Sequence, residues 1–188
     1  MGDKDRRARG ESLNSDRWDQ GVDFEIAPLV ESDLEEVIRI EATSFSNPWT
    51  GEMFRRELKG SGFSFSFVAR LKPTPPGIGG SQVLGYICLW VVGQEMEIAN
   101  LAVHPSWRRK GIGRALMRYG LRFGQKKGAR WAYLEVRASN AAAQKLYRQL
   151  GFEVIGVRER YYQHPLEDAL IMALDMTKGI SGFRGKSP

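Results

Sequence analysis

The segment Arg108-Arg109-Lys110-Gly111-Ile112-Gly113-Arg114 carries the strongest chemical signal in the sequence. It follows a strand-like run and opens a helical pattern. It would therefore lie at a helix N-terminus, where backbone N–H groups lack partners and the helix dipole is positive. Gly111 and Gly113 would let an anion approach those N–H groups closely, and the neighbouring cations add positive charge. The pattern favours a pyrophosphate site, although the glycines could instead serve only to start a helix. It matches neither a Walker loop nor a Rossmann fingerprint.

Two further side chains could move protons. Glu135 lies in the alternating run 131–137 among aromatic residues, where burial would disfavour the charged carboxylate and strengthen it as a general base. The alternative for Glu135 is an ion pair with Arg137 or another arginine. Tyr147 lies two turns into a helix that Asn140 would cap. A phenol, with a pKa of about 10 in water, could protonate a departing thiolate, but Tyr147 could instead be a core aromatic.

Composition narrows the classes of protein. A chain of 188 residues with 42% hydrophobic residues can bury one core. Its longest apolar run, Val83–Val92, is about half the length of a membrane helix, and its polar first residues lack the apolar segment of a signal peptide. Cys88 is the one cysteine, which excludes an internal disulfide. Together with His104 and His164 it offers no zinc-ligand spacing. We therefore expect a cytoplasmic protein with no metal and no membrane partner.

The positive charge is concentrated in one segment. The formal net charge is +6, and nine Lys or Arg residues occur between His104 and Leu134 without any Asp or Glu. Such a segment needs an anionic partner or free solvent. Four of these cations recur every four residues and would form one stripe on the helix that begins near Gly111. The stripe is either a solvated helix face or a contact with RNA or the ribosome. Its members are Arg114, Arg118, Arg122 and Lys126.

Apolar periodicity predicts one domain at residues 23–177, with a disordered N-terminal arm at 1–22 and a flexible basic tail at 178–188. A capping pattern at 32–35 would begin the first helix, and a Pro- and Gly-rich loop occupies 72–82. Interleaved strands and helices predict a mixed α/β sheet with helices on its faces. Seven strands are expected at 24–29, 63–70, 83–92, 96–103, 131–137, 152–160 and 169–176, and four helices at 34–45, 50–58, 111–127 and 141–150.

Several motifs together resemble the GNAT superfamily of N-acetyltransferases. Arg108-x-x-Gly111-x-Gly113 is similar to its acyl-CoA pyrophosphate loop, and here it follows a strand and the stretch 100–105. The stretch 134–143, which reads LEVRASNAAA, is more specific. It resembles the RimI branch, whose members acetylate ribosomal proteins at an N-terminal alanine. The same branch is indicated by Pro48-Trp49, Leu146-Tyr147, Leu150-Gly151-Phe152, Arg160-Tyr161-Tyr162 and the stretch 167–172. The resemblance covers residues 24–176 and implies the GNAT acyl-CoA N-acyltransferase fold.

This resemblance implies acetyl-CoA as co-substrate, no metal, and transfer of the acetyl group to a protein N-terminal amine. Glu135 would act as the base and Tyr147 as the acid. A backbone N–H within 101–103 would polarise the thioester carbonyl. No acyl-enzyme is expected, because Cys88 has no evident activating base. Acyl-CoA would be held by Leu101, Ala102, Val103, Arg108, Arg109, Lys110, Gly111, Ile112, Gly113, Arg114, Asn140 and Tyr147, and the acceptor peptide by Trp49, Tyr161 and Tyr162.

The pKa values of protein amines favour one class of acceptor. An N-terminal amine has a pKa of about 8 and a lysine amine one of about 10.4, so the terminal amine is the easier nucleophile. We expect a small-subunit ribosomal protein as partner, a contact with the ribosome, and no DNA. Another protein N-terminus, a lysine or a small amine is the alternative acceptor. A non-catalytic ribosome- or RNA-binding module suits the basic stripe but leaves Glu135 and Tyr147 without a role. The short segment between Tyr162 and Glu167 would border the acceptor cleft.

Overall fold

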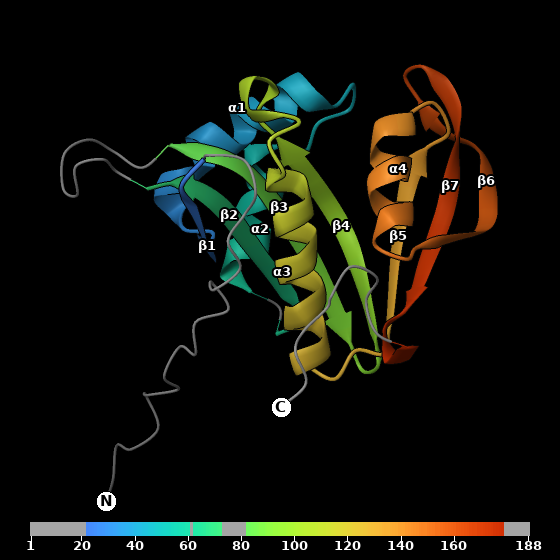
Figure 1. Cartoon of the computed structure of the whole chain (residues 1–188). Helices are drawn as coiled ribbons and strands as arrows, with labels where there is room; N and C mark the ends of the chain where they lie inside the picture. Colours follow the sequence, from blue (N-terminus) through green and yellow to red (C-terminus); the bar gives the residue numbers. More distant parts are fainter. Residues whose placement is uncertain (1–21, 61, 73–81, 179–188) are drawn as a thin grey trace, which may run out of the picture.

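The computed structural model of the chain describes residues 22–60, 62–72 and 82–178. The predicted arm at 1–22, the loop at 72–82 and the tail at 178–188 lie almost entirely outside these residues. The described part contains a seven-stranded sheet with helices on both faces, which confirms the predicted α/β class (Figure 1). The helical elements are η1 (Glu31–Asp33), α1 (Leu34–Ser44), α2 (Gly51–Lys59), η2 (Pro105–Trp107), α3 (Ile112–Lys126), α4 (Ala141–Gln149) and η3 (Met176–Lys178).

The strands follow the order β1-β2-β3-β4-β5-β7-β6 across the sheet. Neighbouring strands are antiparallel except for β4 and β5, which are parallel and are connected through α3. A parallel pair needs such a crossover, whereas the antiparallel pairs can be joined by short turns. The strands are β1 (Phe24–Pro28), β2 (Ser64–Leu71), β3 (Val83–Val92), β4 (Glu95–Val103), β5 (Trp131–Arg137), β6 (Glu153–Gln163) and β7 (Leu166–Asp175).

Successive side chains of the buried strand β3 point alternately into two separate hydrophobic cores. Ile87 and Leu89 face the core that includes α3 and α4, and Tyr86 and Cys88 face the core that includes α1 and α2. In Figure 1, α3 crosses one face of the sheet, and α1 and α2 cover the other. Burial raises the pKa of the Cys88 thiol to about 12, so this cysteine is a small core residue and not an activated nucleophile.

The pairing of β4 with β5 ends in the middle of both strands. Their register runs from Glu95↔Trp131 to Ile98↔Leu134, after which each strand continues without pairing to the other. The two strands visibly diverge in Figure 1. At the same level, β4 carries one extra residue relative to β3, because Cys88 pairs with Asn100 and Leu89 with Ile98. This bulge at Ala99 shifts the alternation of side chains along β4 by one residue, so each later residue faces the opposite side of the sheet from the one it would otherwise face. The bulge therefore decides which side chains line the split, the gap that opens where β4 and β5 stop pairing.

Two local predictions differ from the structure. The capping pattern at 32–35 does not begin α1. A short 3₁₀ turn precedes the helix, and the Asp33 carboxylate accepts a hydrogen bond from the Val30 N–H at 2.9 Å. In addition, β6 ends later and β7 begins earlier than predicted, and the turn between them is at His164-Pro165. Most of β6, which lies at the sheet edge, is exposed, so the burial alternation of a half-buried strand is absent there.

Candidate active site

A cavity of about 1520 Å³ occupies the split between β4 and β5. Its walls come from the α1–α2 loop, the second half of β4, the N-terminus of α3, helix α4 and the β6–β7 turn. The volume exceeds that of most small-molecule pockets, so the cavity has room for a long ligand and a second reactant. Elements that are distant in sequence therefore meet at one place, which is where the chemically interesting residues lie.

The N-terminus of α3 opens into this cavity. Gly111 precedes the helix with φ 79°, and Arg109 has φ 65°, so both adopt the left-handed conformation and the loop turns sharply there. The Arg108 side chain closes this loop, because its Nε donates to the Val103 carbonyl at 3.1 Å and its Nη2 to Ser44 Oγ at 3.1 Å. The predicted anion-binding residues that line the cavity are Arg108, Arg109, Gly111, Ile112, Gly113 and Arg114.

Two of the cations predicted to bind phosphate contact other side chains of the protein. Lys110 is not among the cavity-lining residues, and its Nζ lies 4.4 Å from the centroid of the Trp107 ring. Arg114 lines the cavity, and its Nη2 donates to Gln149 Oε1 of α4. Of the basic stripe on α3, Arg118 also lines the cavity. Part of the stripe therefore belongs to the cavity wall.

The β4 residues beyond the bulge form the opposite wall. Leu101, Ala102 and Val103 line the cavity, and one edge of this segment is paired with β3. The other edge has lost β5 as a partner, because the β4–β5 register stops at Ile98. Successive backbone N–H groups of a strand point to alternate edges, so this segment directs main-chain hydrogen-bonding groups into the split.

Glu135 lies on the β5 side of the same split, and its partner is Arg158 of β6. The Arg158 Nη1 is 3.0 Å from Glu135 Oε1, so the alternative of an ion pair is realised, though not with Arg137. A hydrogen bond to Glu135 raises the pKa of Tyr161 to about 12, with smaller contributions from burial and from the negative charge of Glu135. The Arg158 guanidinium thus orients the carboxylate, which faces the cavity.

Tyr147 and Asn140 bring α4 to the cavity. Tyr147 is 7% exposed, and burial together with the nearby Tyr162 raises the pKa of its phenol. The hydroxyl therefore keeps its proton at neutral pH and can act as a donor. Asn140 lines the cavity and caps α4, with its Oδ1 accepting from Ala143 N at 3.1 Å. The sequence predicted this cap.

Arg137 bonds to both the α1–α2 loop and the β6–β7 turn, and the part of the cavity between these two segments is called its mouth here. The Arg137 Nη2 donates to Ser46 Oγ in the α1–α2 loop at 2.8 Å and to the His164 carbonyl in the β6–β7 turn at 3.1 Å. Its Nη1 pairs with Glu167 Oε2 at 3.1 Å, and its guanidinium lies 4.0 Å from the centroid of the Tyr162 ring. The mouth residues predicted for the acceptor, Trp49, Tyr161 and Tyr162, all line the cavity.

A buried glutamate that the sequence analysis did not select lies in the cavity wall beside Trp49. Glu41 of α1 is 1% exposed and accepts a hydrogen bond from Trp49 N at 2.7 Å. The Asn100 amide of β4 donates to both of its oxygens, at 3.2 and 3.3 Å, and the Tyr86 hydroxyl donates to Oε2. Burial raises the pKa of Glu41 and is opposed by these hydrogen bonds. The network ties the α1–α2 loop to β4.

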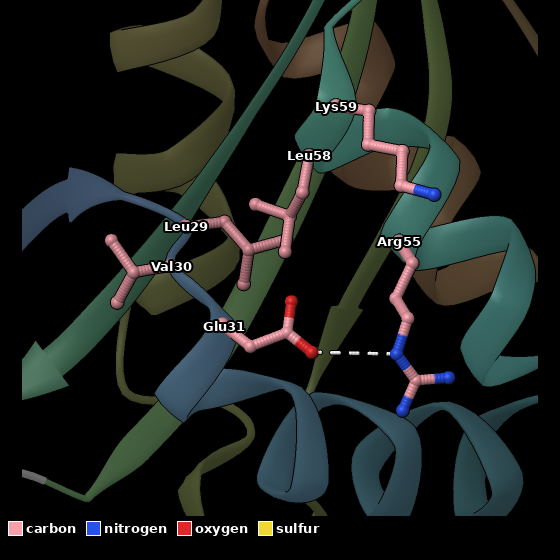
Figure 2. A pocket seen from close by; sticks show the side chains of 6 residues that line it. All are labelled: Leu29, Val30, Glu31, Arg55, Leu58 and Lys59. Atoms are coloured by element: carbon pink, nitrogen blue, oxygen red, sulfur yellow. Dashed lines mark hydrogen bonds and ion pairs between the residues drawn. The ribbon is translucent and has the colours of Figure 1, made fainter.

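A second and smaller pocket, of about 400 Å³, lies between the end of β1 and α2 (Figure 2). Leu29 and Leu58 form its apolar floor. Glu31 and Arg55 form an ion pair of 3.3 Å across it, next to Lys59. None of its residues lines the larger cavity. The residues that line this groove include no tyrosine to protonate a leaving group and no α-helix N-terminus to bind phosphate, so the groove lacks groups that the larger cavity offers to acyl transfer.

The sequence profile of the acetyltransferase (GNAT) family matches residues 34–152, most of the described chain. The chain belongs to the GNAT acetyltransferase family. A GNAT relative, the [ribosomal protein bS18]-alanine N-acetyltransferase of Escherichia coli K12, is 33% identical over 154 residues, which cover 81% of this chain and 97% of the relative. The N-alpha-acetyltransferase RimI of Mycobacterium tuberculosis H37Rv is 36% identical over 152 residues, covering 80% and 91%.

Solved GNAT structures share the fold of this acetyltransferase. The crystal structure of the ribosomal-protein-S18-alanine N-acetyltransferase from Escherichia coli aligns with a TM-score of 0.69 and 30% identity, over 88% of this chain and 98% of that one. Arabidopsis thaliana NAA60 in complex with acetyl-CoA aligns with a TM-score of 0.74 and 21% identity, over 82% and 99%, and shows the fold alone. The predicted GNAT fold is therefore confirmed.

Within residues 22–60, 62–72 and 82–178, no helix is long and apolar enough to span a bilayer. The same residues contain no group of three or more His, Cys, Asp or Glu side chains placed to hold a metal ion.

Proposed function

We propose that this GNAT enzyme transfers the acetyl group of acetyl-CoA to the N-terminal amine of a small-subunit ribosomal protein that begins with alanine. One observation carries the proposal. The cavity that starts at the cationic N-terminus of α3 reaches the carboxylate of Glu135 through the β4–β5 split. Anion-binding and proton-accepting groups thus face one space. The name of the Escherichia coli relative supports alanine of a ribosomal protein as the acceptor, and that of the Mycobacterium tuberculosis relative supports an α-amine.

The residues around α3 fit a pyrophosphate. Gly111 in the left-handed conformation leaves the first N–H groups of the helix open toward the cavity, where Arg109 and Arg114 add positive charge. The β4 segment from Leu101 to Val103 would hold the thioester end with main-chain groups that no longer serve β5. Acetyl-CoA would supply an activated acyl carbon and a sulfur leaving group at this point.

The side chains around that point would handle the protons. Glu135 takes a proton from the acceptor nitrogen, directly or through a water, and Arg158 keeps its carboxylate oriented. Main-chain N–H groups of β4 stabilise negative charge that develops on the carbonyl oxygen. Tyr147 gives its proton to the departing thiolate, because its buried phenol stays protonated. Cys88 is buried in the other core, which supports direct transfer without an acyl-enzyme.

The architecture of the mouth supports a chain terminus as the acceptor. Arg137 joins the α1–α2 loop to the β6–β7 turn, so a reactant must pass between these walls beside Trp49 and Tyr162. An extended N-terminus would enter end-on, and its amine is easier to deprotonate than that of a lysine. The alternative of an RNA-binding module has less support, because Arg114 and Arg118 of the basic stripe line the cavity.

Mass spectrometry of acceptor peptides tests the proposal. The protein is incubated with acetyl-CoA and peptides that begin with alanine and contain an internal lysine, and fragmentation locates the acetyl group. A matched peptide with a blocked N-terminus serves as the control. We expect one acetyl group on the α-amine and none on the blocked peptide. Modification of the lysine alone, or of neither amine, would contradict the proposal.

A further inference from the structure

Glu97 of β4 is a cavity-lining carboxylate that the proposed proton transfers do not use. The last registered pair between β4 and β5 is Ile98↔Leu134, and both side chains are buried in the core that includes α3. Because side chains alternate along a strand, Glu97 and Glu135 both lie on the opposite face, diagonal to each other across the two strands. The end of the split where β4 and β5 are still paired is therefore acidic.

Charge compensation at this acidic end is incomplete. The Arg158 guanidinium pairs with Glu135 at 3.0 Å, so one cation faces two carboxylates. In the part of the chain that the structure describes, the Glu97 side chain forms neither an ion pair nor a hydrogen bond. Burial and the negative charge of Glu135 raise the pKa of Glu97, whereas Arg158 acts in the opposite direction. A second cation would therefore bind favourably beside Glu97.

The other end of the cavity has the opposite sign. Its cations surround the N-terminus of α3 and the exposed side of α4, and they are Arg108, Arg109, Arg114, Arg118 and Lys145. Phosphates would occupy this cationic end. An acceptor chain that passes between the α1–α2 loop and the β6–β7 turn would pass Arg137, whose charge is paired with Glu167, and would then meet the acidic end. Such complementarity of charge contributes more to selectivity than to overall affinity.

We propose that Glu97 selects acceptor chains that carry a lysine or an arginine at the second or third residue. The inference rests on the proposed transfer to an N-terminus, because an α-amine beside Glu135 brings the next residues close to the same strand ends. An extended chain advances by about 3.3 Å per residue, so the long stems of lysine and arginine at these positions can span the remaining gap. A free small amine has no such side chains to offer.

The overall field of the protein cannot produce this preference. The net charge of the chain is +6, which disfavours cationic peptides at long range. Screening at physiological salt weakens interactions between exposed charges beyond about 8 Å, whereas Glu97 would act at contact distance. A preference for cationic acceptors would therefore report a local carboxylate.

Three peptides of equal length that begin with alanine provide the test. One carries arginine at the second residue, one at the third, and one carries glutamine at both. For each peptide, kcat/KM for α-amine acetylation and the affinity for the CoA-saturated full-length protein are measured. Fluorescence anisotropy gives the affinity. We expect an arginine peptide to exceed the glutamine peptide by about fivefold or more in both quantities, which corresponds to a partly exposed charge pair.

The Glu97→Gln variant should reduce that ratio to about one. Glu95→Gln is the matched control, because Glu95 is exposed on the same face of β4, farther from the split, and is not a cavity-lining residue. The control should keep the ratio. A ratio near one in the unmodified protein, or a ratio that persists in Glu97→Gln while turnover falls on every peptide, overturns the inference. Selective binding of arginine peptides without acetylation of any α-amine would refute the proposed function and leave the selectivity of Glu97 standing.

Discussion

Replacement of Glu41 by alanine should destabilise the fold and loosen the acceptor side of the cavity. The carboxylate accepts hydrogen bonds from Trp49 N at 2.7 Å, from the Asn100 amide at 3.2 and 3.3 Å, and from the Tyr86 hydroxyl. Tyr86 is 0% and Asn100 8% exposed, so these two donors are shielded from solvent. Each buried donor left without an acceptor costs about 1–3 kcal/mol. We therefore expect Glu41→Ala to lower the free energy of unfolding by about 3 kcal/mol.

Glutamine at position 41 should have a smaller effect. It keeps the volume and one acceptor oxygen, but its amide group presents a donor to groups that also donate, so charge-assisted bonds become neutral ones. The sign of the pH dependence offers a second test. Burial raises the pKa of Glu41 above its ordinary value of 4.5, so the folded state binds this proton more tightly than the unfolded chain. Stability should fall as the pH rises from 4.5 through the folded pKa, and Glu41→Gln should lack this decline.

Urea denaturation measures the free energy of unfolding and its dependence on pH. Steady-state kinetics with an acceptor peptide measures whether a looser α1–α2 loop weakens peptide binding. Glu35→Ala is the control on the same helix, because Glu35 is exposed and pairs only with the exposed Arg39. That pair should contribute less than about 1 kcal/mol. The KM for the peptide should rise in Glu41→Ala while the KM for acetyl-CoA changes little. A loss of stability no larger than that of the Glu35 control would refute the reasoning.

Glu135→Gln should lower turnover by about a hundredfold with acetyl-CoA affinity retained, as steady-state kinetics and titration calorimetry would measure. Gly111→Asp should weaken acetyl-CoA binding at least tenfold through charge repulsion, while Gly111→Asn, which tolerates the same φ of 79° without the charge, should bind more tightly than the aspartate variant. Arg137→Ala should raise the KM for the peptide roughly tenfold, because Ser46 and the His164 carbonyl lose their shared donor.

Local patterns predicted most of the secondary structure. The strands 83–92 and 131–137 match β3 and β5, because both are short apolar or alternating runs between clear breakers. The cap of α4 at Asn140 was predicted because a short-range hydrogen bond to Ala143 is encoded by adjacent residues. The same locality limits these predictions, since a pattern within one element contains no information about its partner in another.

The partners of the charged residues could not be predicted. Glu41 occupies an ordinary helical position in the sequence, yet its hydrogen-bond donors come from a loop and two strands as far away as Asn100. Arg137 is two residues from Glu135 on the same strand face, but its guanidinium is engaged by Glu167 of β7 and by the mouth. Arg158 pairs with Glu135 only because β6 lies at the sheet edge beyond β7. These contacts depend on strand order, which periodicity does not reveal.

The bulge at Ala99 connects the fold to the site. Before it, the even residues Met96 and Ile98 face the core that includes α3, and after it the odd residues Leu101 and Val103 face that side. One extra residue therefore turns Asn100 toward Glu41 and places the β4 segment beside the N-terminus of α3. Without the bulge, Asn100 would enter an apolar core and Leu101 would face the other side. The bulge lies at the level where β5 diverges, so the groups that would otherwise pair with β5 become available to a ligand.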